Sequence, residues 1–210
     1  MKHYDIVQGT DEWFTIKLGK VSASHINDVM ATVKSGEAVT RRNYRAKLIA
    51  EKLTGAWEVS FQSADMARGI LVEPQARLAY QFAENVEVEQ VGWVDHPHID
   101  NAGASPDTFV NTEGLAEIKC PKTATHLDYI MYGMKNLKYK LQMQFQMACT
   151  GRKWCDFVSY DPKLPVHLQL FVKRFERDDE LILEIETAVS QFIFDMDEVL
   201  NKVLSKGARG

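Results

Sequence analysis

Apolar residues recur at helical spacing in the first third of the chain. Within residues 22–33 they lie three or four positions apart, which predicts a short helix, and Ser22 or Ser24 can serve as its cap. Residues 40–54 repeat the pattern, with Thr40 as the expected cap. The first part of the chain is therefore predicted to be helical.

A third helix is predicted over residues 64–83, although Gly69 and Pro74 predict a break or a bend inside it. Helical spacing returns later in the chain, where it predicts helices over residues 124–133, 137–150 and 178–204.

Runs of strand character alternate with these later helices. They cover residues 86–94, 107–111, 115–120, 154–160 and 166–175. The order of helices, strands, helices, strands and a final helix predicts an α/β (α+β) fold, with a central mixed sheet flanked by helices. No linker-like tract interrupts the pattern, so we expect a single domain over residues 1–210.

The composition narrows the class of protein. The net charge is −4, whereas a protein that passively coats DNA is usually basic. Metal sites are built from acidic residues, so a nuclease with a local basic groove is compatible with this charge. No segment approaches the roughly 20 apolar residues of a membrane span, and the N-terminus lacks the apolar core of a signal peptide. We expect a soluble, cytoplasmic protein without membrane association.

The sequence lacks the motifs of a cysteine-based site and of a nucleotide-binding site. The three cysteines are odd in number and form no C-x-x-C pair, so buried thiols are expected in place of disulfides or a metal cluster. The sequence lacks the glycine-rich phosphate loop of ATP-driven enzymes, so no nucleotide cofactor is expected.

Two acids and a lysine stand in two neighbouring strand-like runs. If the runs form a hairpin centred near Thr112 and Glu113, position 107 pairs with about 118, and Asp107 lies beside Glu117. Side chains alternate along a strand, so Glu117 and Lys119 share a face while the residue between them turns into the core. Two carboxylates and an ammonium group are thus predicted to converge.

This arrangement suits a magnesium-dependent nuclease. Carboxylate oxygens are preferred ligands of Mg²⁺, and the backbone carbonyl of Ile118 can supply another oxygen. A lysine beside the metal can hold or deprotonate the attacking water. The pattern alone is also compatible with a charged strand edge.

The wider context of these residues resembles a known family. Ser105-Pro-Asp107 with Glu117-Ile-Lys-Cys-Pro121 resembles the core of the PD-(D/E)XK nucleases, and among them the phage lambda exonuclease (alkaline exonuclease) type. Further family-like segments are Trp13 followed by Lys17-Leu-Gly-Lys-Val-Ser-Ala-Ser24, then Gly69-Ile-Leu-Val-Glu73, Gln142-Met-Gln144 and Tyr160-Asp-Pro162. The resemblance covers nearly the whole chain.

The resemblance implies roles for five residues. Asp107 and Glu117 match the metal-binding acids, and Lys119 matches the catalytic lysine. Glu73 matches a helix-borne acid that reaches the site through metal-bound water, and Gln144 matches a glutamine that positions the nucleophile or the lysine. By itself, Glu73 would be an ordinary helix-surface acid, and Gln144 a polar residue on a half-buried helix face.

The resemblance also implies a pocket for a terminal 5′-phosphate. Lys17, Ser24 and Ser105 match the residues that cradle it. The familiar family member has arginine where this chain has Lys17, so bidentate recognition is replaced by a point charge.

A basic run adds candidate DNA contacts. Lys34 precedes Arg41, Arg42 and Arg45 at the start of a predicted helix, where the helix dipole disfavours cations. This placement favours an external anion such as the DNA backbone, although a solvated helix face explains the run equally well.

Together these features predict a nuclease that digests one strand of linear double-stranded DNA from its 5′ end, leaving a 3′ overhang for recombination by strand annealing. The resemblance implies two Mg²⁺ ions, with Mn²⁺ as a substitute, a ring-shaped homotrimer, and a single-strand annealing protein as partner in a phage or prophage setting. Two alternatives remain open, namely a structure- or sequence-specific endonuclease on the same core and a non-catalytic DNA-binding protein.

Overall fold

Two mixed sheets form the framework of the protein in this computed structural model, which describes residues 2–57 and 64–207. The first sheet has the order β1-β4-β5-β2, from His3–Tyr4, Trp93–Asp95, Ala102–Ala104 and Val21–Ser22. The second has the order β3-β6-β7-β8-β9, from Val88–Gln90, Thr108–Val110, Gly114–Lys119, Trp154–Tyr160 and Leu170–Glu176. β2 pairs with β5, and β7 with β8, in parallel, while the other pairings are antiparallel. The predicted α/β class with a mixed sheet flanked by helices is confirmed, and the structure has two mixed sheets where one was expected.

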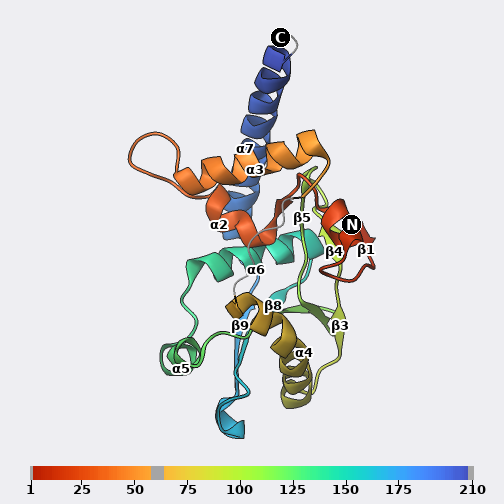
Figure 1. The fold of residues 1–210 in the computed structure, drawn as a ribbon. Helices are drawn as coiled ribbons and strands as arrows, with labels where there is room; N and C mark the ends of the chain where they lie inside the picture. Colours follow the sequence, from red (N-terminus) through yellow and green to blue (C-terminus); the bar gives the residue numbers. More distant parts are fainter. Residues whose placement is uncertain (1, 58–63, 208–210) are drawn as a thin grey trace.

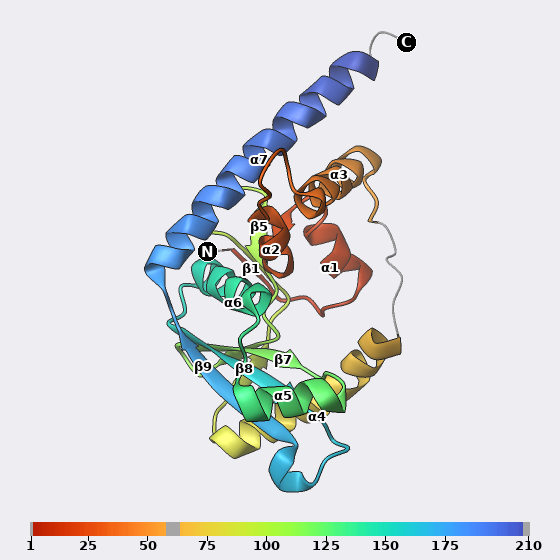
Figure 2. The same ribbon diagram turned by 90° about the vertical axis from the view of Figure 1, so that its left-hand side faces the viewer.

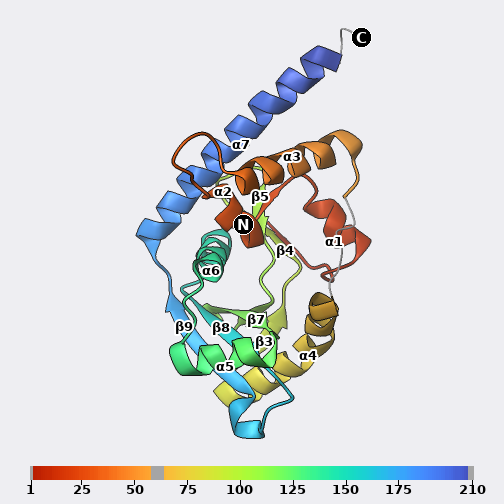
Figure 3. The same cartoon turned by 60° about the vertical axis from the view of Figure 1, so that its left-hand side comes forward.

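The helices of the described residues are α1 (Asp11–Ile16), α2 (Ile26–Val29), α3 (Val39–Thr54), α4 (Ala64–Glu84), α5 (Thr123–Tyr132), α6 (Leu137–Thr150) and α7 (Asp179–Gly207). Helix α4 packs on one face of the five-stranded sheet, and α5 and α6 pack on the other. Helix α6 lies between the two sheets, α4 packs on β7, β8 and β9, and the end of α7 projects beyond the body (Figures 1, 2 and 3). The larger apolar core includes Leu115 and Phe157 on the α6 side, and a smaller one joins Ala116 and Ile118 to α4.

The alternation of side chains in β7 decides where its polar residues point. Leu115 lies in the core on the α6 side, and Ala116 and Ile118 lie in the core against α4. Because faces alternate along a strand, Glu117 and Lys119 point to the same side as Leu115. The predicted inward turn of Ile118 is confirmed.

Three predicted helices differ from the structure in detail. The helix expected over residues 22–33 is only a 3₁₀ turn (Ala23–His25) followed by α2, because β-branched Thr32 and Val33 and the turn-forming residues after them do not favour further helix. Helix α3 has Ala38 as its N-cap, without a capping side chain, so the Thr40 cap was wrong. Helix α4 continues through Gly69 and Pro74, since packing on the sheet offsets the hydrogen bond that Pro74 cannot donate.

The strand predicted over residues 86–94 is divided between the two sheets. β3 belongs to the five-stranded sheet and β4 to the other, and Gly92 lies between them. A Cβ atom at Gly92 would lie only 2.5 Å from the carbonyl oxygen of Tyr4, so the chain can cross here only with glycine.

Candidate active site

The β6–β7 hairpin places the two predicted acids side by side. Thr108 pairs with Ala116 in this antiparallel register, so Asp107 lies opposite Glu117, one position from the predicted pairing. The Asp107 Oδ2 atom accepts a hydrogen bond of 2.7 Å from the backbone N–H of Ile118. The hairpin therefore fixes the Asp107 carboxylate on the face that carries Glu117 and Lys119.

Glu117 is buried, with 1% of its surface exposed, and its carboxylate accepts hydrogen bonds from three side chains of the described residues. The Lys119 ammonium donates to Oε1. From α6, the side-chain amide of Gln142 donates to Oε1 at 2.7 Å and that of Gln146 to Oε2 at 2.6 Å. Gln142 and Gln146 lie one helical turn apart, so both point toward the sheet. The two amides hold the Glu117 carboxylate in one orientation.

Gln144 does not lie at this site, and the predicted role for it was wrong. Two positions along a helix turn the side chain to the opposite face, and the Gln144 amide donates to the carbonyl oxygen of Glu176 at 2.8 Å. Its side-chain oxygen accepts from the N–H of Asp178 at 2.9 Å, so Gln144 joins α6 to the β9–α7 connection. The four-residue spacing of Gln142 and Gln146 was the signal that would have found the right pair.

This difference gives a test of the two glutamine faces. We expect Gln146→Leu to lower cleavage about a hundredfold, because small misplacements of a reacting group cost about that much. Gln144→Ala should keep activity within about threefold, because its side chain lies away from the acids. It should lower the melting temperature, because the two hydrogen bonds of the Gln144 amide are lost, each worth about 1 kcal/mol. Cleavage rates and thermal melts of both variants check this. Equal activity in the two variants would show that the hydrogen bond from Gln146 to Glu117 does not support cleavage.

The charges of the site depend on one another. Exclusion from water and the neighbouring Glu117 carboxylate raise the pKa of Asp107 well above its usual range. Burial alone would lower the pKa of Lys119, but the carboxylates of Glu117 and Asp107 raise it. The Lys119 ammonium, 5.4 Å from the centre of the Tyr139 ring, is therefore charged and acts as counter-ion to the acids.

The donor set fits an oxygen-coordinated divalent cation. Within the described part of the chain, no three or more His, Cys, Asp and Glu side chains gather in a way that could hold a metal. Two carboxylates are nevertheless what Mg²⁺ uses when water and substrate phosphate complete its coordination. Burial and the neighbouring Glu117 carboxylate both disfavour the ionised form of Asp107, and a cation beside the pair would offset the repulsion between the two carboxylates. The buried Gln146 Oε1 atom, which lacks a hydrogen-bond partner among the described residues, can accept from a water there.

Helix α4 brings the Glu73 carboxylate close enough for its charge to act on Asp107. Within the described residues, no hydrogen bond joins Glu73 to Asp107, Glu117 or Lys119. The Glu73 carboxylate forms an ion pair with Arg77 and is partly exposed, and its charge contributes to the raised pKa of Asp107. One turn and a residue earlier, Arg68 donates to the carbonyl oxygen of Pro121 at 2.7 Å and to Asp161 Oδ1 at 2.9 Å. Arg68, which the sequence did not single out, thus fastens α4 to the end of β7.

The predicted phosphate pocket opens into the same cavity as the acids. A cavity of about 180 Å³ is lined by Lys17, Ser24 and Ser105 together with Asp107, Glu117 and Lys119. The structure therefore brings these six predicted residues together.

The Ser105 hydroxyl and the Lys17 ammonium of the pocket are already oriented by their neighbours. The Ser105 hydroxyl donates to the carbonyl oxygen of Gly92 and accepts from the indole N–H of Trp13 at 2.9 Å. The Lys17 ammonium lies 3.2 Å from the centre of the Trp13 ring. Burial, and to a lesser degree the charge of Lys47, lower the pKa of Lys17 to about 8. Ser24 remains exposed, with its hydroxyl 3.2 Å from that of Ser22.

Two of the predicted DNA-contacting arginines have internal partners. Arg41 donates to Glu37 at 2.7 Å and to Asp195 at 2.8 Å, and Arg45 binds both carboxylate oxygens of Glu37. Glu37 lies just before α3, and its carboxylate balances the charges of Arg41 and Arg45 in the first turns of that helix. An external anion is therefore not required to explain these two arginines. Arg42 and Lys34 are exposed on the surface and keep the predicted role as a hypothesis.

A mixed sheet whose hairpin carries Asp107, Glu117 and Lys119 on one face is the arrangement of the PD-(D/E)XK nucleases. The chain belongs to the YqaJ-like viral recombinase family, because the sequence profile of that domain matches residues 12–153. The family and the nuclease arrangement of the site together support a nuclease role in recombination.

Solved structures agree with this assignment. An alkaline exonuclease (LHK-Exo) from Laribacter hongkongensis is 48% identical, with a TM-score of 0.90 over 95% of this chain and 99% of that one. The same enzyme in complex with dAMP is 49% identical, with equal coverage and TM-score. A phage-related exonuclease from Haemophilus somnus 129PT, 17% identical with a TM-score of 0.73, covers 88% of this chain and 96% of that one and shares the fold. No curated protein sequence matches.

No helix within residues 2–57 and 64–207 is long and apolar enough to cross a membrane.

Proposed function

We propose that the protein is a Mg²⁺-dependent exonuclease that digests one strand of linear double-stranded DNA from 5′ to 3′ and leaves a 3′ overhang for strand annealing. One observation carries the proposal. Lys17, Ser24 and Ser105 line the same cavity as Asp107, Glu117 and Lys119. A 5′-phosphate held by the first group would place the following phosphodiester beside the second, so the pocket would set the polarity.

The residues of the site have complementary tasks in this reaction. Asp107 and Glu117 would hold the cation, which supplies charge stabilisation at the phosphate and a more acidic water. Lys119 would orient the attacking water or the phosphate, and Gln142 and Gln146 keep Glu117 in place. The water oxygen bonds to phosphorus, the bond from phosphorus to the 3′ oxygen breaks, and the 3′ oxygen takes up a proton. The shortened strand again carries a 5′-phosphate, which the same pocket can bind.

The 5′-phosphate pocket makes a testable prediction. We expect duplex ends with a 5′-phosphate to be digested faster than 5′-hydroxyl ends, and Lys17→Ala to reduce this preference about ten- to a hundredfold, the range for a hydrogen bond to a charged group. Because the pKa of Lys17 is about 8, its charge and the preference should be stronger at pH 7 than at pH 9.

Lys17→Arg is the matched control for that experiment. It should keep the preference and lose the pH dependence, because arginine stays charged throughout this range. Initial rates on duplexes that differ only in 5′-phosphorylation provide the measurement. A wild-type enzyme without preference, or an alanine variant that retains it fully, would show that the pocket is wrongly placed.

The assembly and partners are proposed on the family resemblance alone. They are a ring-shaped homotrimer around the DNA and a single-strand annealing protein. Light scattering should then give about three times the chain mass of 23.9 kDa, and a monomer with distributive digestion would speak against the ring.

A further inference from the structure

A second pocket lies next to the catalytic cavity and has an aromatic wall. Phe14 on α1 and Trp57, which follows the end of α3, stack with ring centres 3.6 Å apart and planes 6° from parallel. Both rings line a pocket of about 200 Å³. Aromatic rings at a pocket wall offer a flat apolar surface, which suits a flat ligand.

This aromatic pocket, as we call it below, is continuous in its lining with the catalytic cavity. Lys17, Ser22 and Ser24 belong to the walls of both. The Lys17 ammonium lies 5.1 Å from the centre of the Phe14 ring. A phosphate bound at Lys17 would therefore stand at the boundary between the two, with an aromatic wall on one side and the acids on the other.

The other residues that line the aromatic pocket suit a ligand that carries a phosphate group. Lys47 and Lys20 line the pocket, and the latter forms an ion pair with Asp95 at 2.7 Å. The lining carboxylate of Glu51 is balanced, because it accepts from the N–H of Gly19 at 2.9 Å and lies 3.6 Å from the Lys47 ammonium. The pocket thus combines stacked rings with an excess of cations.

We propose that the aromatic pocket binds the nucleobase of the 5′-terminal nucleotide, stacked against the Phe14–Trp57 pair, while the phosphate of that nucleotide lies at Lys17. This inference rests on the proposed exonuclease function and specifies how the site holds its substrate. A base in this pocket cannot remain paired with the other strand, so stacking offsets part of the cost of opening the last base pair. Stacking accepts every base, which suits an enzyme that digests any sequence.

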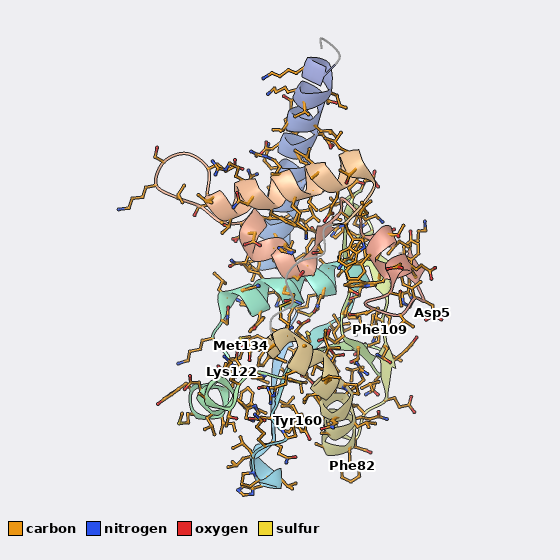
Figure 4. All side chains as sticks on the ribbon, in the orientation of Figure 1. Asp5, Phe82, Phe109, Lys122, Met134 and Tyr160 are labelled. Carbon is orange, nitrogen blue, oxygen red and sulfur yellow. The ribbon has the colours of Figure 1, made fainter. Side chains whose placement is uncertain are left out.

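The first experiment measures binding without turnover. Wild-type protein should bind dAMP about tenfold more tightly than 2-deoxyribose 5-phosphate, because base–aromatic stacking contributes about that factor or more. Trp57→Ala should reduce the ratio to about threefold or less, and Trp57→Phe should restore most of it. Phe82→Ala is the matched control, since Phe82 is 90% exposed at the far end of α4 and points away from the body (Figure 4). Equal wild-type affinities for the two probes, or an unchanged ratio in Trp57→Ala, would overturn the proposal.

The second experiment uses duplex DNA whose 5′-phosphorylated terminal nucleotide is either normal or abasic. The ratio of first-cleavage rates on the two ends is taken within each enzyme, so a partly unfolded variant does not distort it. Fraying of the abasic end is common to all enzymes and cancels between them. The ratio of normal to abasic rates should fall about tenfold from wild type to Trp57→Ala and remain unchanged in Phe82→Ala.

The two proposals fail in different ways. Digestion of linear duplex with the same ratio in wild type and Trp57→Ala overturns the aromatic pocket and leaves the exonuclease proposal standing. An enzyme that digests no linear duplex refutes the exonuclease proposal, and the binding of dAMP against 2-deoxyribose 5-phosphate still decides whether the pocket holds a base.

Discussion

Replacement of Lys119 by alanine is expected to lower the rate of DNA cleavage by about a thousandfold or more, within the range for lost acid–base or electrostatic catalysis. The ammonium is the cation that the Glu117 carboxylate binds in the cavity. The lysine side chain is 28% exposed, so its loss leaves no hole in the core. DNA binding should therefore stay close to that of the wild type, while the metal-free variant should melt at a lower temperature, because the buried acids lose their counter-ion.

The measurement is single-turnover digestion of a labelled duplex together with binding to the same DNA. Lys122→Ala is a matched control, because Lys122 is 71% exposed and pairs with Asp65 at the surface. It should cleave at nearly the wild-type rate. A Lys119→Ala rate within about tenfold of wild type, or about 1.4 kcal/mol of barrier, would remove Lys119 from the chemistry.

Asp107→Asn is expected to abolish cleavage and, without metal, to stabilise the protein. The pKa of Asp107 is raised in the folded state, so the folded protein binds this proton more tightly than the unfolded chain. The stability contribution is present below the unfolded pKa and is lost as pH rises through the folded pKa. At pH 8 the metal-free variant should melt about 2–5 °C higher than wild type, and the difference should shrink toward pH 4.

Divalent metal should reverse that order. Mg²⁺ and Ca²⁺ should both raise the melting temperature of the wild type and have little effect on Asp107→Asn, because the carboxylate is lost. Only Mg²⁺ should support rapid cleavage, since Ca²⁺ coordinates more loosely and is a poorer Lewis acid. EDTA should stop the reaction. Equal turnover with both metals, or a variant that responds to Mg²⁺ like the wild type, would contradict the two-acid site.

The acids and the lysine could be predicted from sequence because their geometry is local. A short hairpin and the two-residue period of a strand determine that Asp107, Glu117 and Lys119 meet, and an error of one position in the register did not change this result. The predicted pairing needed no knowledge of the rest of the fold.

The glutamines show where motif matching fails. Gln142-Met-Gln144 matches a family pattern, but helix periodicity places Gln142 with Gln146 on the face of α6 that meets Glu117. The spacing of apolar residues in α6 could not show which face of the helix meets the five-stranded sheet, because every residue from Leu141 to Thr150 is buried. That choice depends on the packing of α6 between the two sheets.

Long-range contacts account for the other differences. Arg41 binds Asp195 on α7, and this contact exists only because α7 packs against α3. The sequence alone does not show this packing, so it predicted that Arg41 was free to contact DNA. β1 and β2 have two residues each, too few for any period to appear, and tertiary pairing alone defines them. The Phe14–Trp57 contact likewise joins α1 to the end of α3 and leaves no local signal.

The central claim is tested most directly by digesting one linear duplex that carries a distinguishable label at each end of one strand, with the closed circular form of the same DNA alongside. With Mg²⁺, the account predicts early release of the 5′ label as mononucleotide, late release of the 3′ label, an intact circle, and no reaction with EDTA or with Lys119→Ala. Early release of the 3′ label, or cleavage of the circle at a comparable rate, would contradict it.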